Sequence, residues 1–144
     1  MPTRMANERF VCFHGSPRRP INEYVFPDDI YTAPQKMSAI FDRFEALCFV
    51  GHTHVPGVFV PDPDFYAPEE LNHRYTITDE RAMINVGSVG QPRDQDRRAS
   101  CAVFDSTKGT FRVFRLPYDV PGAQNKIRAA GLPEYLALRL DYGQ

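Results

Sequence analysis

Three short apolar runs that end in glycine or histidine constrain the fold of this 144-residue chain more than any other feature. The runs and their endings are residues 10–13 with His14-Gly15, residues 47–50 with Gly51-His52-Thr53-His54, and residues 82–86 with Gly87-Ser88-Val89-Gly90. Short runs rich in Phe and Val and bounded by glycine are typical of buried β-strands. If the three strands lie side by side in one sheet, the loops after them meet at one edge, where α/β sheets bind ligands.

The remaining pattern predicts more strands than helices. Further strands are expected at residues 58–60 and 74–78, and as a hairpin of residues 101–104 and 110–116. Helices are expected from Pro34 to residue 45 or 46, at 124–130 and at 134–140, with a proline-containing loop at 14–33. These elements indicate an α/β (α+β) fold, and the chain length fits a single domain over residues 1–144.

Composition argues against two classes of function. With 17 Lys and Arg against 18 Asp and Glu, the formal net charge of −1 disfavours a nucleic-acid binder held by bulk positive charge. No apolar run approaches the ~18 residues of a membrane span. Cys12, Cys48 and Cys101 lie in apolar runs without a C-x-x-C motif, as buried thiols of a reducing compartment do. We therefore expect a cytoplasmic protein that binds neither nucleic acid nor a membrane.

The histidines after the second run form a pattern of metal ligands. His52 and His54 flank one residue on a tight turn, and the first run delivers His14 to the same edge of the predicted sheet. Neutral imidazoles are common ligands of divalent transition metals, and the short spacing lets two rings converge on one ion or serve two neighbouring ions. The alternative is a polar turn whose histidines make only local hydrogen bonds. The position directly after the strands favours the metal site.

The third run is followed by a glycine-rich loop with an arginine, residues 85–93, of sequence NVGSVGQPR. Gly87 and Gly90 permit backbone conformations that direct successive N–H groups at an anion. Arg93 and two further arginines follow, and guanidinium groups beside metal-binding histidines suit a phosphate-bearing substrate. An ordinary surface loop, with its arginines solvated beside two aspartates, explains the pattern equally well.

Taken in order, His14-Gly15, Gly51-His52-Thr53-His54 and residues 85–93 resemble the C-terminal half of the calcineurin-like metallophosphoesterases. They are most similar to the small bacterial subgroup related to diadenosine tetraphosphatases and protein phosphatases. The resemblance implies a four-layer αββα sandwich of mixed sheets, of which this chain would be a part without the N-terminal strands. It also implies metal-dependent hydrolysis of phosphate esters at a site that holds Mn, Fe or Zn ions.

The resemblance implies roles for individual residues. His14 and His52 would bind one metal ion and His54 would bind the other, while no residue of this chain receives a catalytic role. The residues expected on the substrate side are Asn85, Gly87, Ser88 and Arg93.

The chain departs from the family pattern in its carboxylates. The family motifs D-x-H, G-D-x-x-D and G-N-H-[D/E] do not occur in the sequence, so the bridging aspartate, the other ligands of one metal and the proton-donating histidine have no counterparts. We therefore expect at most one metal ion in this chain alone. Because the missing half would cover an apolar face, we also expect self-association or a partner protein there.

Two hypotheses for the function remain open at this point. The first is a truncated phosphoesterase with an incomplete metal site. The second is a degenerate, non-catalytic domain that binds a partner or a single metal ion, and the sequence leaves enzyme activity open between them.

Overall fold

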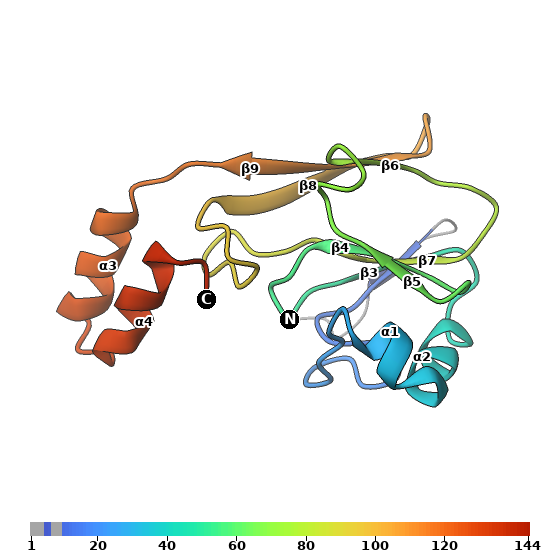
Figure 1. Cartoon of the computed structure of the whole chain (residues 1–144), viewed down its shortest axis with the longest axis horizontal. Coiled ribbons are helices and arrows are strands. Elements are labelled where there is room, and N and C mark those ends of the chain that lie inside the picture. Colours follow the sequence, from blue (N-terminus) through green and yellow to red (C-terminus); the bar gives the residue numbers. More distant parts are fainter. Residues whose placement is uncertain (1–4, 7–9) are drawn as a thin grey trace.

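Two β-sheets and a set of short helices make up the chain in a computed structural model that describes residues 5–6 and 10–144 (Figure 1). The six-stranded sheet has the order β1 (Met5–Ala6), β2 (Phe10–Cys12), β3 (Leu47–Val50), β7 (Ala82–Asn85), β4 (Gly57–Val60) and β5 (Asp64–Tyr66). The three-stranded sheet has the order β6 (Arg74–Thr76), β9 (Thr110–Leu116) and β8 (Ala99–Asp105). The helical elements are α1 (Asp29–Thr32), α2 (Pro34–Phe41), α3 (Val120–Ala129), α4 (Glu134–Leu138) and the 3-10 turn η1 (Arg139–Asp141). The predicted α+β fold with two sheets is confirmed.

The three apolar runs lie side by side, as the sequence predicts. β2 pairs in parallel with β3, with Phe10 opposite Leu47, and β3 pairs in parallel with β7, with Val50 opposite Asn85. β4 runs antiparallel to β7. The carboxyl ends of the three parallel strands therefore reach the same edge of the sheet, and the loops after them start from that edge.

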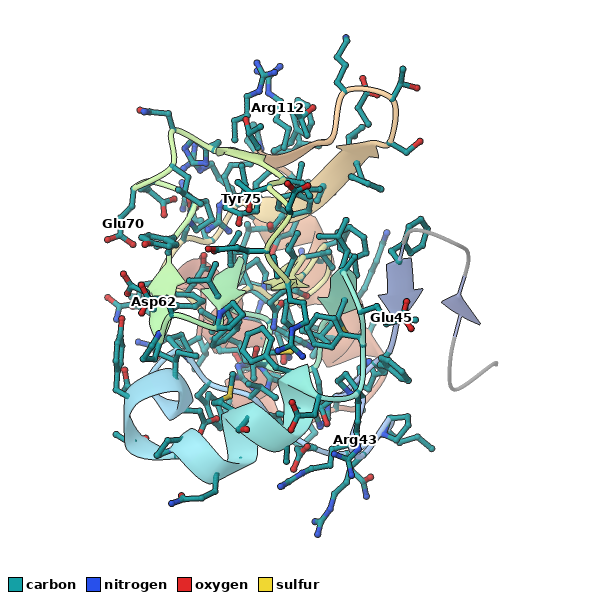
Figure 2. All side chains as sticks on the ribbon, turned by 90° about the vertical axis from the view of Figure 1, so that its right-hand side faces the viewer. Arg43, Glu45, Asp62, Glu70, Tyr75 and Arg112 are labelled. Carbon is teal, nitrogen blue, oxygen red and sulfur yellow. The ribbon has the colours of Figure 1, made fainter. Side chains whose placement is uncertain are left out.

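The central sheet is covered on both faces, which explains why β3 and β7 read as continuous apolar runs. Buried side chains between the sheet and the helices α1 and α2 include Ile30, Met37, Ile40, Phe41, Cys48 and Met83. Buried side chains between the two sheets include Leu47, Val58, Ile84, Phe111 and Val113. Figure 2 shows side chains filling the space on both sides of the sheet, with charged residues such as Arg43 and Glu70 at the outside. The loops that carry the histidines thus start from a sheet that is covered by packed side chains on both faces.

The helix α2 ends earlier than the sequence predicts. It ends at Phe41 rather than near residue 45. The backbone after Phe41 forms a tighter turn, in which the Arg43 N–H donates to the carbonyl of Ile40, three residues earlier, at 3.1 Å. Phe44, which the helical spacing places in the core, is buried all the same. The spacing therefore identified the buried residues correctly and the helix end incorrectly.

The helices near the C-terminus also differ from the prediction. α3 begins at Val120 rather than at residue 124, because the carboxylate of Asp119 accepts a hydrogen bond from the Gly122 N–H and caps the first turn. α4 is followed by the turn η1, and Figure 1 shows α3 and α4 together beyond one end of β9. Within the described ranges, none of the helices is long and apolar enough to cross a membrane.

The short elements α1 and β5 are among those that the sequence pattern does not predict. α1 lies inside the segment expected to be a loop, and a single buried residue, Ile30, anchors it to the core. β5 pairs with β4 at the edge of the large sheet, where the ring of Phe65 packs against that of Phe59. Both elements are too short for a periodic pattern to show in the sequence.

Candidate functional site

The carboxyl ends of β2 and β3 bring His14 and His52 together. The loops that carry them are joined by the Gly51 N–H, which donates to the carbonyl of His14 at 3.0 Å. The centroids of the two imidazole rings lie 4.5 Å apart, with an angle of 61° between the ring planes. The prediction that these two rings lie within a few ångströms of each other is confirmed.

The turn after β3 directs His52 and His54 to the surface and Thr53 to the interior. His52 and His54 have positive φ angles of 64° and 63°, and Thr53 is 1% exposed. Its N–H donates to the carbonyl of Gly51 at 2.7 Å, and its hydroxyl accepts from the side-chain amide of Asn85 at 2.7 Å. A left-handed conformation costs a non-glycine residue about 1–3 kcal/mol, and such strain gathers at functional sites. The packing of Thr53 therefore holds two strained histidines in place.

The ring of His52 carries an unused nitrogen. Its Nε2 atom is buried and has no hydrogen-bond partner in the described part of the chain. Burial lowers the pKa of His52, and electrostatic interactions with His14, His54 and Arg93 lower it further. The imidazole is therefore neutral near pH 7, and a bound cation would satisfy the orphaned nitrogen.

The ring of His54 is oriented by the glycine-rich loop. Its Nδ1 lies 2.7 Å from the carbonyl of Gln91, and because a carbonyl only accepts, Nδ1 carries the proton and Nε2 keeps its lone pair. This arrangement is typical of histidines that bind metals, since the hydrogen bond fixes both tautomer and ring orientation. Burial lowers the pKa of His54, the bond to Gln91 opposes this, and Arg93 lowers the pKa again.

The three histidines do not form one ligand set. Among residues 5–6 and 10–144, no three His, Cys, Asp or Glu side chains come together in a way that could hold a metal ion. His14 and His52 are a pair in direct contact, and His54 stands apart on the same cavity.

The glycine-rich loop after β7 is held by Asn85 at its start. This side chain is 1% exposed, donates to the carbonyl of Gly51 at 2.9 Å and accepts from the Gly87 N–H at 2.9 Å. Asn85 thus links the histidine turn to the loop. Its predicted contact with a substrate stays a prediction, because these bonds already engage both ends of the amide.

Gly87 and Ser88 line the cavity itself. Gly87 has a φ angle of 77°, and a Cβ atom there would lie 2.6 Å from the hydroxyl oxygen of Ser100, so only glycine fits. The Ser88 hydroxyl accepts from the Gln91 N–H at 2.9 Å, which closes the loop on itself. Both residues lie where the sequence places a phosphate, and their contact with substrate stays a prediction.

Arg93 lies beside His54 and keeps its charge available. Its N–H donates to the carbonyl of His54 at 3.2 Å, and its guanidinium donates to the side-chain oxygen of Gln91 at 2.6 and 3.0 Å. In the described part of the chain, no carboxylate lies within ion-pair distance of Arg93. Arg98, in contrast, is paired with Asp96 at 2.5 Å, so the surface-loop interpretation fits Arg98 and not Arg93.

An open cavity of about 1100 Å³ joins these residues to the space between the sheets. Its polar side is lined by His14, His52, His54, Gly87 and Ser88. Its apolar side is lined by Phe10, Phe49, Ala102, Phe104 and Phe111. A charged group at the histidines would therefore have both a cationic neighbourhood and an apolar wall within reach.

Two residues at the site were not singled out from the sequence. Gln91 orients both His54 and Arg93, and Tyr24 stacks on the ring of His52 with 3.9 Å between ring centroids. Gln91 lies inside the predicted loop, and its side-chain amide, which can both donate and accept hydrogen bonds, is the signal that could have identified it. Tyr24 lies in the segment expected to be a loop, where only the short apolar run of residues 24–26 offered a signal.

The chain is similar in sequence and in fold to known proteins. No family model matches the chain. Uncharacterized protein MJ0912 from Methanocaldococcus jannaschii is 35% identical over 138 residues, which are 95% of this chain and 53% of that protein. The crystal structure of a metallophosphoesterase from Sphaerobacter thermophilus matches with a TM-score of 0.84 at 37% identity, over 100% of this chain and 59% of that one.

A second solved structure is similar in fold alone. It is the crystal structure of hypothetical protein PH1004 from Pyrococcus horikoshii OT3, with a TM-score of 0.70 at 18% identity over 100% of this chain and 52% of that one. The chain thus spans between 52% and 59% of each of these three proteins, about half their length.

Proposed function

Because the chain has the fold of the C-terminal half of a metallophosphoesterase, we propose that it supplies a histidine-bound divalent metal site for the hydrolysis of phosphate esters. The observation that carries this proposal is the contact between His14 and His52, with the buried Nε2 of His52 left without a partner beside the glycine-rich loop. A pair of imidazoles at the carboxyl edge of parallel strands is a ready pair of ligands.

One divalent transition ion fits these residues. His14 and His52 would hold it, and His54 would serve a second position once further ligands are present. Mn, Fe and Zn all suit imidazole ligands, and such an ion supplies Lewis-acid polarisation of a phosphoryl oxygen. A second ion needs ligands beyond those that the described residues bring together, and a carboxylate bridge would have to come from elsewhere.

The rest of the cavity rim fits a phosphate group. Gly87 and Ser88 of the loop line the cavity, and Arg93, next to His54, adds a guanidinium without a carboxylate partner in the described part of the chain. Guanidinium groups bind phosphate through two parallel hydrogen bonds and offset its charge. In this arrangement the chain binds and orients the ester, while hydrogen bonds to Gln91 hold the side chains of Arg93 and His54 in place.

The apolar side of the cavity fits a protein partner. Phe10, Phe49 and Phe104 form a contiguous group with ring centroids 5.5 to 5.8 Å apart, and this group lines the open cavity. Large apolar surfaces of this kind mark sites of association. We propose that a second copy or another polypeptide covers this wall and completes the metal site.

A non-catalytic metal-binding domain is the second candidate. It is favoured by one observation, namely that no third metal-ligating side chain joins His14 and His52 in the described residues. Both candidates share the metal site and differ in turnover.

The test combines metal binding with a phosphoesterase assay. Calorimetric titration of the whole chain with Zn²⁺ and Mn²⁺ is expected to show one site, which His52→Asn weakens at least tenfold. Asparagine also tolerates a positive φ angle, so this variant keeps the turn. His73→Asn is the matched control, because His73 also has a positive φ angle, 58°, and lies outside this cavity. No metal binding by the wild-type chain would overturn the proposal. Metal binding without hydrolysis of any phosphate ester would favour the non-catalytic domain.

A further inference from the structure

A row of aromatic rings leads from the histidine pair to the outside of the molecule. The ring of Tyr24 stacks on His52 with 3.9 Å between centroids and 24° between planes. The ring of Phe26 lies parallel to Tyr24, with 5.5 Å between centroids and 3° between planes. Tyr24 is 41% exposed and Phe26 is 50% exposed, so both rings offer apolar surface to a ligand beside the histidines.

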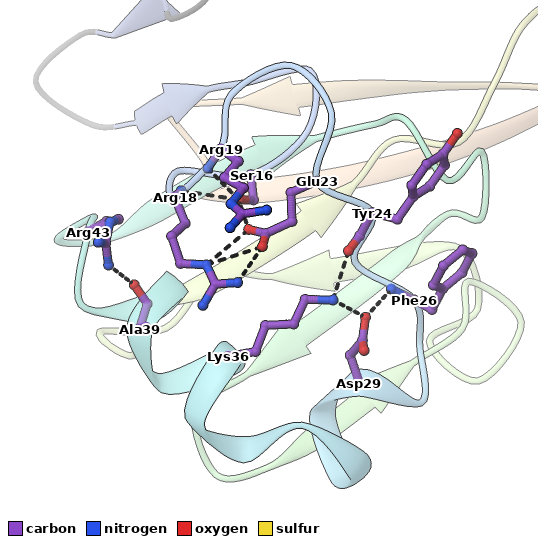
Figure 3. A network of polar contacts seen from close by, with 10 residues as sticks. All are labelled: Ser16, Arg18, Arg19, Glu23, Tyr24, Phe26, Asp29, Lys36, Ala39 and Arg43. Carbon is purple, nitrogen blue, oxygen red and sulfur yellow. Dashed lines mark hydrogen bonds and ion pairs between the residues drawn. The ribbon is translucent and has the colours of Figure 1, made fainter.

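The backbone under these two rings is held rigidly, as Figure 3 shows. The ammonium of Lys36 donates to the carbonyl of Tyr24 at 2.8 Å and to the carboxylate of Asp29 at 2.6 Å. The same carboxylate accepts from the Phe26 N–H at 2.7 Å. Val25, between the two rings, is 3% exposed and belongs to the core. The two exposed rings are therefore fixed on both sides of a buried anchor.

The segment before the rings is anchored in the same way. Glu23 is 8% exposed, accepts from the hydroxyl of Ser16 and is paired with Arg18 at 2.5 Å (Figure 3). Glu23 and Val25 point inward, whereas Tyr24 and Phe26 point outward. A surface whose side chains are already ordered loses little entropy on binding, and this favours a flat ligand placed on it.

We propose that Tyr24 and Phe26 form a stacking platform for a planar aromatic group carried by the phosphate ester, such as a nucleobase or an aryl ring. This inference rests on the proposed function, since it places the phosphate at the histidines and Arg93. Stacking on aromatic side chains tolerates every base, because each base has a π-face. The two side chains present ring surface and one hydroxyl, which predicts a preference for aromatic esters with little discrimination among bases.

Affinity measurements separate the platform from the phosphate site. Titration calorimetry of the whole chain with added Zn²⁺ compares AMP, adenosine, ribose 5-phosphate and 4-nitrophenyl phosphate. We expect AMP to bind about 5- to 100-fold more tightly than ribose 5-phosphate. Phe26→Leu is expected to remove that preference while leaving the affinity for ribose 5-phosphate unchanged. Tyr135→Leu is the matched control, since Tyr135 is 63% exposed on α4.

Each result bears on one of the two proposals. Equal affinities for AMP and ribose 5-phosphate would overturn the platform and leave the phosphate site standing. Adenosine binding that Phe26→Leu weakens, with no gain from a phosphate group, would support the platform and count against the proposed function. If AMP binds more tightly than ribose 5-phosphate but 4-nitrophenyl phosphate does not, nucleotides would be identified as the ligand. Ring-current shifts in the NMR resonances of Tyr24 and Phe26 on adding adenosine are expected, and their absence would contradict stacking.

Discussion

The side-chain amide of Asn85 donates to the hydroxyl of Thr53 at 2.7 Å, beneath the turn that carries the two surface histidines. Asn85 ends one parallel strand, and Thr53 follows the neighbouring strand, so this buried hydrogen bond joins the two loops of the site. The same amide reaches the carbonyl of Gly51 and the N–H of Gly87. The positions of the histidines and of the glycine-rich loop are therefore coupled through one residue.

Asn85→Ala is expected to destabilise the chain and to weaken metal binding. The substitution takes from the Gly87 N–H its acceptor and from the Gly51 carbonyl and the Thr53 hydroxyl one hydrogen bond each, and a buried polar group left without a partner costs about 1–3 kcal/mol. Urea unfolding followed by circular dichroism measures the free energy of unfolding, and a Zn²⁺ titration measures the affinity. Asn125→Ala, at an exposed position of α3, is the control and is expected to change stability by less than about 0.5 kcal/mol. Equal stability of the two variants would contradict the coupling.

Glu23 predicts a loss of stability in acid. Burial raises the pKa of Glu23, but hydrogen bonds from Arg18 and Ser16 outweigh burial and leave this pKa below its ordinary value of 4.5. Since the folded pKa is depressed, the stabilisation is complete above the unfolded pKa. It disappears as the pH falls below about 4.5 and through the lower folded pKa. Glu23→Gln should be less stable than the wild-type chain at pH 7, and the difference should shrink between about pH 5 and pH 3. A constant difference across this range would show that the carboxylate charge is not involved.

Arg115 is expected to be the most sensitive ion-pair residue of the chain. Its side chain is 4% exposed and pairs with Asp94, which is 11% exposed, on the loop that follows Arg93. Arg115→Met leaves the carboxylate buried without a partner, which costs about 3–5 kcal/mol. Arg128→Met breaks the exposed pair with Glu134 and should leave the free energy of unfolding almost unchanged, because water screens this pair. Thermal or urea unfolding of the two variants measures the contrast, and similar losses would contradict a buried pair that anchors this loop.

The sequence predicts the parallel strands and the contact of His14 with His52, because both follow from local patterns. Short apolar runs identify buried strands, and their glycine and histidine endings mark one edge. The stacking of Tyr24 on His52 could not be predicted, since Tyr24 directly follows none of the strands and belongs to no motif that would place it at this edge of the sheet. The left-handed conformations of His52 and His54 also depend on the buried Thr53 between them and on Asn85 from another strand. The spacing of residues within a short segment of sequence does not predict such contacts.

Local spacing also failed to predict where the helices end and that His54 lies apart from the pair His14 and His52. Spacing in the sequence left open whether the histidines converge on one ion or serve two neighbouring ions. In the structure His54 turns toward the carbonyl of Gln91, which lies 37 positions later in the chain, and no three ligating side chains come together in the described residues. Its role at a second metal position depends on side chains that no pattern in the described residues supplies.

The apolar wall of the cavity predicts that the isolated chain associates. Phe10, Phe49 and Phe104 line the open cavity, and removing a phenylalanine side chain from water stabilises a complex by about 1.5–3 kcal/mol. Sedimentation velocity at micromolar concentrations is expected to show species larger than a monomer, or a monomer that binds an exposed-hydrophobe dye. Phe104→Glu should reduce both signals, because a carboxylate on this wall would lose its hydration on association. Tyr135→Glu on α4, outside the cavity, should leave both signals unchanged. A compact monomer that binds no dye would show that the wall is covered by the chain itself, and would remove the reason to expect a partner at the metal site.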